Sequence, residues 1–204
     1  MPPPSLLDDE VLREIIAVGR VDVLVGIPTY QNEETIAELV RAVHRGLDRD
    51  FLRDRTVVVN ADGGSTDRTR DLVRAFGRGE SPTVHVSQSL RTQHLISTPY
   101  HGLPGRGPAV RQFFAIADLL QARAVVVVDP EVVSFEPGWV KALAQPVLLH
   151  DCGFVAPAYR RHPLDGPLVS QLARPLVRAA FGVRLLEPLG GEFACSGAFA
   201  AHAL

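Results

Sequence analysis

Three short polar segments of the sequence each follow a run of aliphatic residues, and all three contain carboxylates. They span residues 28–34, 62–67 and 129–131. In sheets of parallel strands, ligands bind beyond the carboxyl ends of the strands, which share one edge. The coincidence of three such segments therefore predicts one polar site, and it does so more strongly than any single segment.

The third segment has the residue types of a cation site. Asp129 and Glu131 are two residues apart at a predicted strand end, so both carboxylates point to the same side if the chain stays extended. Two converging carboxylates suit Mg²⁺ or Mn²⁺, which bridges to phosphate oxygens. An isolated pair of this kind is more often two solvated acids in a turn. The position directly after the valines at 125–128 favours the metal site.

The second segment suits a nucleotide. Asp62 precedes Gly63 and Gly64, and glycines allow a ligand to approach the backbone closely. Its carboxylate is able to accept hydrogen bonds from a base or a ribose. An ordinary Asx turn before the next helix explains the same residues equally well. Glu33 and Glu34 likewise have a competing role as favourable charges in the first turn of a helix.

A glycine-rich cationic stretch precedes a predicted helix. Gly105, Arg106 and Gly107 form a loop that is able to close over a diphosphate, although a plain glycine-rich loop fits the spacing as well. The stretch is not a Walker A motif, and no G-x-G-x-x-G follows the first strand, so P-loop and dinucleotide-binding classes lose support.

The hydrophobic pattern places these segments on alternating strands and helices. It predicts strands at 21–27, where Pro28 ends the strand, and at 56–59, 83–86, 124–128 and 154–156. It predicts helices at 6–18, at 36–47 with Asn32 as N-cap, and after Ser65 or Thr66. It also predicts helices from Pro108 to about 120, from Pro137 until Pro146 breaks it, and at 168–182 with a kink or break at Pro175. Residues 87–107 read as a long loop. This order implies an α/β fold with a mostly parallel, doubly wound sheet.

The composition sets limits on the protein's partners. The 204 residues are 46% hydrophobic and carry a formal net charge of −2, which gives no electrostatic basis for a nucleic-acid partner. The length suits one domain with a buried core. The longest apolar run, 124–128, is too short to span a membrane, and the two cysteines form no zinc motif. With no signal peptide visible, we expect a cytoplasmic protein.

Taken together, these segments resemble the GT-A glycosyltransferases of the family-2 type. The match rests on residues 23–34, 62–67 and 129–131. Residues 105–109 are similar to the Gly-Lys-Gly loop of glucosyl-3-phosphoglycerate synthases. Residues 159–166 and 187–193 look like the acceptor-side motifs of that group and of the mannosylglycerate synthase-like enzymes. The resemblance implies a Rossmann-like GT-A fold.

The resemblance also implies a reaction, namely a retaining transfer of a hexose from UDP-glucose or GDP-mannose to a small glycerate-like acceptor, with Mg²⁺ or Mn²⁺ as cofactor. By residue-wise carry-over, Pro28, Tyr30 and Glu33 border the base, Asp62 and Gly63 face the base or ribose, and Gly105 and Arg106 lie at the diphosphate. Asp129 would contact ribose and metal, and Glu131 would be the main protein ligand of the metal. Tyr159, Arg160, Asp165, Gly166, Gly190, Gly191 and Glu192 would line the acceptor pocket. Catalysis is then assigned to Arg106, Asp129 and Glu131.

The sequence departs from this family in several places. The metal motif is usually Asp-x-Asp and here ends in Glu131, and the Gly-Arg-Val-Thr segment of the phosphoglycerate enzymes is absent. Family members continue beyond the equivalent of Leu204 and supply a histidine metal ligand there. We therefore expect an N-terminal extension (1–20), a nucleotide-sugar-binding part (21–150) and the beginning of an acceptor-binding part (151–204) whose remainder is missing.

Two other functions stay open at this stage. One is a non-catalytic nucleotide-sugar-binding domain, and the other is a nucleotidyltransferase, whose glycine-rich start motif is absent after the first strand. A homodimer is compatible with the sequence.

Overall fold

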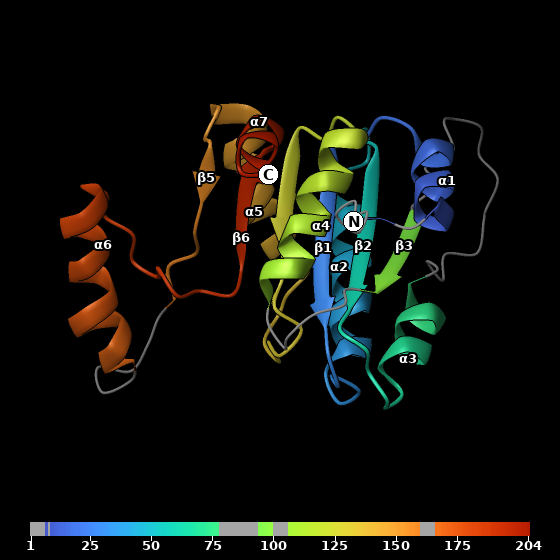
Figure 1. The fold of residues 1–204 in the computed structure, drawn as a ribbon, viewed down its shortest axis with the longest axis horizontal. Helices are drawn as coiled ribbons and strands as arrows, with labels where there is room; N and C mark the ends of the chain where they lie inside the picture. Colours follow the sequence, from blue (N-terminus) through green and yellow to red (C-terminus); the bar gives the residue numbers. More distant parts are fainter. Residues whose placement is uncertain (1–6, 8, 78–93, 100–105, 160–165) are drawn as a thin grey trace, which may run out of the picture.

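The computed structural model describes residues 7, 9–77, 94–99, 106–159 and 166–204, and their strands form one six-stranded sheet. The strand order is β3-β2-β1-β4-β6-β5 (Figure 1). The strands are β1 (Val23–Thr29), β2 (Thr56–Asp62), β3 (His94–Pro99), β4 (Ala124–Val127), β5 (Phe154–Val155) and β6 (Phe193–Ser196). The first four are parallel, whereas β6 runs antiparallel to both β4 and β5. The predicted α/β fold with a mostly parallel sheet is confirmed.

Helices cover both faces of the sheet (Figure 1). They are α1 (Asp9–Val18), α2 (Ile36–Asp50), α3 (Thr69–Phe76), α4 (Arg106–Leu119), α5 (Gly138–His150), the π-helical turn η1 (Leu168–Ala173), α6 (Arg174–Phe181) and α7 (Gly197–His202). Side chains of α1, α4 and α7 pack on one face, and those of α2, α3 and α5 on the other. None of the described helices is long and apolar enough to cross a membrane.

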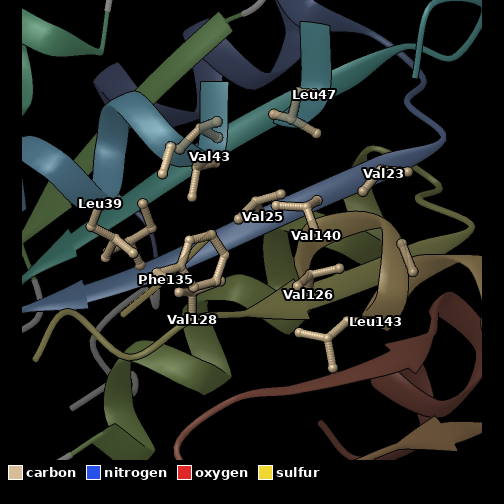
Figure 2. Close-up of a cluster of buried hydrophobic side chains, with 14 of the residues drawn as sticks. Val23, Val25, Leu39, Val43, Leu47, Val126, Val128, Phe135, Val140 and Leu143 are labelled. Carbon is tan, nitrogen blue, oxygen red and sulfur yellow. The ribbon is translucent and has the colours of Figure 1, made fainter. Parts of the chain in front are cut away.

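The central strands are buried on both faces because successive side chains alternate between two hydrophobic layers. Val23 and Val25 of β1 join the layer under α2 and α5, whereas Leu24 joins the layer under α4. Figure 2 shows the first of these layers, with Val25 and Val126 beneath the side chains of the two helices. Every residue of β1, β2 and β4 is buried.

The prediction that Pro28 ends the first strand is wrong, because β1 continues through Pro28 to Thr29. Backbone groups of a strand alternate between its two neighbours. Gly26 faces β4, since its carbonyl accepts from the Val128 amide, and Thr29 faces β2, since its carbonyl accepts from the Gly63 amide. Pro28 therefore faces the β4 side, where the register ends at Gly26 and Val127. Its missing N–H removes no bond from the ladder.

Two predicted helix starts are also wrong. Helix α2 begins at Ile36 after Thr35, because the Asn32 side chain accepts from the Tyr30 amide and does not cap the helix. Helix α3 begins at Thr69 after Arg68, because the Ser65 hydroxyl donates to Asp62. In both cases the expected capping side chain is bound to the preceding loop.

Two further predictions need correction around the prolines and the long loop. Pro146 does not end α5, which continues to His150 because Val147 beyond it is still packed in the core. The segment predicted as loop contains β3, and α4 begins at Arg106 rather than Pro108. The predicted strand at 83–86 lies outside the described residues. The helix does not break at Pro175, because η1 continues directly into α6. Only the helix type changes there, beside a proline that lacks the N–H of a regular α-helix.

Candidate functional site

A pocket lies where the winding of the sheet reverses. The chain runs from β1 outward to β2 and β3 and then returns to β4 on the other side of β1. Such reversals leave a crevice at the carboxyl ends of the strands. Here the crevice is a pocket of about 180 Å³, lined by Pro28, Thr29, Tyr30, Asn32, Arg106, Asp129, Pro130 and Glu131.

Hydrogen bonds join the three polar segments at this edge. The Thr35 hydroxyl donates to the Pro130 carbonyl at 2.6 Å, which ties the loop after β1 to the loop after β4. The Gly63 amide donates to the Thr29 carbonyl at 2.7 Å, which ties it to the loop after β2. The expectation that the segments meet at one edge of the sheet is confirmed.

Asp62 organises the loop that follows β2. Its carboxylate accepts from the Thr29 and Ser65 hydroxyls, from the Gly64 and Ser65 amides, and from the Arg70 guanidinium. Burial raises the pKa of this carboxyl, but the hydrogen bonds from Ser65 and Arg70 outweigh it, so the pKa lies below its usual range. Asp62 is 5% exposed and does not line the pocket. The geometry is that of the Asx turn, with Thr29 standing between Asp62 and the pocket.

Glu33 has a similar internal role. Its carboxylate accepts from the Arg68 amide at 3.1 Å, and its own amide donates to Asp67 at 3.2 Å. These reciprocal bonds connect the loops after β1 and β2. Glu33 is not among the residues that line the pocket, whereas Pro28 and Tyr30 are.

Asp129 and Arg106 form an ion pair in the pocket. One carboxylate oxygen of Asp129 pairs with the Arg106 guanidinium, and the other accepts from the Glu131 amide at 3.0 Å. The arginine begins α4 and the aspartate follows β4, so the fold brings together two residues that are distant in the sequence. The side chains are 39% and 20% exposed, which leaves the pair open to a ligand.

The segment before β6 closes over this ion pair. A β-carbon on Gly191 would clash with the Asp129 carboxylate and would lie only 2.5 and 2.8 Å from the two terminal nitrogens of Arg106. Glycine is therefore required at this position by close approach rather than by backbone conformation. A β-carbon on Gly190 would lie 3.7 Å from the ring of Tyr159, so that ring lies beside the same segment.

Glu192 is a buried carboxyl at the ion pair. It is 2% exposed, and its Oε1 atom has no hydrogen-bond partner among the described residues. Burial raises the pKa of this carboxyl, and the nearby Asp129 charge adds to the increase while Arg106 opposes it. The segment predicted to face the acceptor therefore adjoins the residues predicted to face the diphosphate.

Other predicted residues lie elsewhere or outside the described part. Gly166 has a φ of +68° and its carbonyl accepts from the amides of Val169 and Ser170, so it begins η1. No described contact joins it to the pocket. Gly105, Arg160 and Asp165 lie outside the described residues. Sequence reasoning did not assign Thr29, Asn32 and Pro130 to the site, although all three lie within the segments that signalled it.

The carboxylates fit a divalent cation in type and number. Mg²⁺ and Mn²⁺ sites commonly use one or two protein carboxylates, with phosphate and water oxygens completing the shell. Asp129 and Glu131 supply two carboxylates in one pocket. Among the described residues, no group of three or more His, Cys, Asp or Glu side chains is arranged to hold a metal. The arrangement therefore suits a cation shared with a phosphate ligand better than one held by protein alone.

Comparison with known proteins supports the GT-A fold that the sequence predicts. The sequence matches no protein-family model and no curated protein. A crystal structure of glucosyl-3-phosphoglycerate synthase from M. tuberculosis is similar, with a TM-score of 0.62, 25% identity and coverage of 97% of this chain and 64% of that chain. A structure of the same enzyme from Mycobacterium tuberculosis with Mn²⁺, UDP and glucosyl-3-phosphoglycerate gives a TM-score of 0.61 and 25% identity, over 97% and 63%.

A third solved structure, described as a mycobacterial protein, gives a TM-score of 0.62 and 28% identity over 92% of this chain and 57% of that chain. The chain therefore spans 57–64% of the length of these three proteins. The resemblance inferred from the sequence is confirmed at the level of structure, and the chain has the GT-A glycosyltransferase fold seen in glucosyl-3-phosphoglycerate synthase.

Proposed function

We propose that this chain is the nucleotide-sugar-binding part of a metal-dependent hexosyltransferase. The observation that carries the proposal is the pocket at the carboxyl ends of β1 and β4, where Tyr30, Arg106, Asp129 and Glu131 meet. An aromatic ring, a guanidinium and two carboxylates are the groups that a base, a diphosphate and a divalent cation require. A similar solved structure was obtained with Mn²⁺ and UDP.

Glu131 and Asp129 are the residues that would hold the cation. A divalent cation would supply positive charge that stabilises the leaving diphosphate. Glu131 is exposed in the pocket. Its longer side chain is able to reach inward from the loop while the Glu131 amide keeps Asp129 in place.

Arg106 would add a second positive charge to the pocket, beside Asp129. Guanidinium groups bind phosphate oxygens with two parallel hydrogen bonds. In the transfer reaction, negative charge develops on the diphosphate oxygen that loses its bond to the sugar, and a cation held nearby stabilises that charge. Arg106 is positioned for this role because α4 begins at the rim of the pocket.

The donor and acceptor classes are the finer part of the proposal. UDP-glucose or GDP-mannose is the donor, and a small glycerate-like acceptor is placed beside Tyr159, Gly190 and Glu192. The support is the contact of this segment with the Asp129–Arg106 pair. We further propose that the transfer retains configuration by front-face attack, since the two carboxylates that line the pocket are the ones assigned to the cation.

The proposal is tested by calorimetric titration of UDP into the protein with and without Mn²⁺. We expect Mn²⁺-dependent binding in the wild type and its loss in Glu131→Ala, because that variant lacks the proposed main ligand. Glu136→Ala is the matched control, since Glu136 is an exposed acid of the same loop outside the pocket. Equal Mn²⁺-dependent affinity in wild type and Glu131→Ala would refute the assignment. Turnover of UDP-glucose or GDP-mannose then separates an enzyme from a non-catalytic binding domain.

A further inference from the structure

The cationic group beside Asp129 in this structure is an arginine. The Arg106 guanidinium pairs with Asp129, lies against the Gly191 backbone and adjoins the buried Glu192 carboxyl. It thus partly neutralises the same carboxylate that the proposed function assigns to a divalent cation.

We propose that Arg106 and the divalent cation compete for Asp129, and that a bound diphosphate relieves this competition by drawing the guanidinium away. The inference rests on the proposed function and adds a regulatory property to it. Without nucleotide, the cation binds weakly because Arg106 occupies its place. With nucleotide, the cation and the diphosphate bind cooperatively.

The geometry permits this exchange. The Arg106 side chain is 39% exposed and belongs to the first turn of α4, so it is free to turn on its long aliphatic stem without disturbing the core. Phosphate offers a guanidinium the same two-point contact that a carboxylate does. Departure of the guanidinium leaves the Asp129 carboxylate without its compensating positive charge, which strengthens its attraction for Mg²⁺ or Mn²⁺.

Thermodynamic linkage makes the inference measurable. If nucleotide raises the affinity for the cation by some factor, then the cation raises the affinity for nucleotide by the same factor. Part of that factor comes from the cation bridging to the phosphate, and part from the release of Arg106. Removing the guanidinium abolishes only the second part.

The experiment uses calorimetry of Mn²⁺ alone, UDP alone, and UDP in saturating Mn²⁺. It compares wild type with Arg106→Gln, Arg106→Lys and Arg111→Gln. Arg111 is an exposed arginine of the same helix and is not among the residues that line the pocket, so its variant controls for the loss of one positive charge. We expect Arg106→Gln to bind Mn²⁺ alone about tenfold more tightly than wild type, since a contacting positive charge is removed from a partly exposed site. Arg106→Lys and Arg111→Gln should bind Mn²⁺ alone about as tightly as the wild type does, because the first keeps the positive charge and the second lies outside the pocket.

Different outcomes refute the proposed function and the competition for Asp129. Absence of Mn²⁺-dependent UDP binding in the wild type would end the proposed function. If the wild type shows that binding but folded Arg106→Gln binds Mn²⁺ alone no more tightly, the competition is refuted and the proposed function stands. An equal increase in Arg111→Gln would also refute it, because the effect would then be one of overall charge.

Discussion

Gly191→Ala is the most direct test of how the segment before β6 supports the site. Its β-carbon would lie 2.5 Å from one terminal nitrogen of Arg106, whereas ordinary contact begins at 3.4 Å. The guanidinium must therefore retreat by about 0.9 Å. The same methyl group would obstruct the Asp129 carboxylate oxygen that pairs with Arg106, on the carboxylate that would hold the proposed cation.

The expected effect on folding is small. The atoms that clash belong to the ends of two partly exposed side chains, and such an ion pair contributes ~0–1 kcal/mol to stability. The expected effect on binding is larger, because binding constellations tolerate displacements of only about 0.5 Å. We expect the affinity for UDP in the presence of Mn²⁺ to fall by about tenfold or more.

The assay pairs thermal unfolding with calorimetric titration of UDP in saturating Mn²⁺. Gly153→Ala is the matched control, since a β-carbon on Gly153 meets nothing within 4 Å. Both variants should unfold close to the wild-type temperature, and only Gly191→Ala should bind UDP weakly. Wild-type affinity in Gly191→Ala would show that the segment does not support the site and would refute the reasoning.

Two further predictions concern the scaffold. Gly26→Ala should destabilise the fold by about 1–3 kcal/mol in urea unfolding, because its β-carbon would lie 2.5 Å from the ring of the fully buried Phe113. If adding Phe113→Leu to this variant restores none of the lost stability, the clash with Phe113 is not the cause. Asp62→Asn should lose less folding free energy than the wild type as the pH falls. The pKa of Asp62 is lowered by folding, so its carboxylate stabilises the fold above the unfolded pKa of about 4 and ceases to do so as the pH falls through the lower folded value. Denaturant unfolding of wild type and variant between pH 7 and pH 2 measures the difference, and parallel curves would contradict it.

The sequence was sufficient to predict the sheet and the edge of the sheet at which the candidate site lies. The valines of β4 and the aliphatic residues of β1 and β2 are apolar at every position, so the pattern identifies strands buried on both faces. The polar segments that follow them must then share an edge, since the strands are parallel. For this reason Asp129 and Glu131 could be assigned to that edge from the pattern alone, whereas Tyr30 and Arg106 were assigned through the family resemblance.

Local signals failed where a side chain was bound within the preceding loop, or where core packing continued beyond a proline. Asn32 and Ser65 are residue types that commonly cap helices. Here the Asn32 side chain accepts from the Tyr30 amide, and the Ser65 hydroxyl donates to Asp62 and accepts from the Gln31 amide. Proline commonly ends a helix, yet α5 continues through Pro146 because Ala144 before it and Val147 after it are both packed in the core. A capping preference of about 1 kcal/mol is easily outweighed by several tertiary contacts.

The residue types and their order along the chain thus determined that acidic and basic side chains lie at one edge of an α/β sheet. Only the tertiary structure decided which partners these side chains have. It turned Asp62 inward, where five hydrogen bonds satisfy its carboxylate. It also paired Arg106 with Asp129 beneath Gly191. The physical reason is that hydrophobic periodicity is a local property of the sequence, whereas ion pairs and close backbone approach depend on loops that only the complete fold brings together.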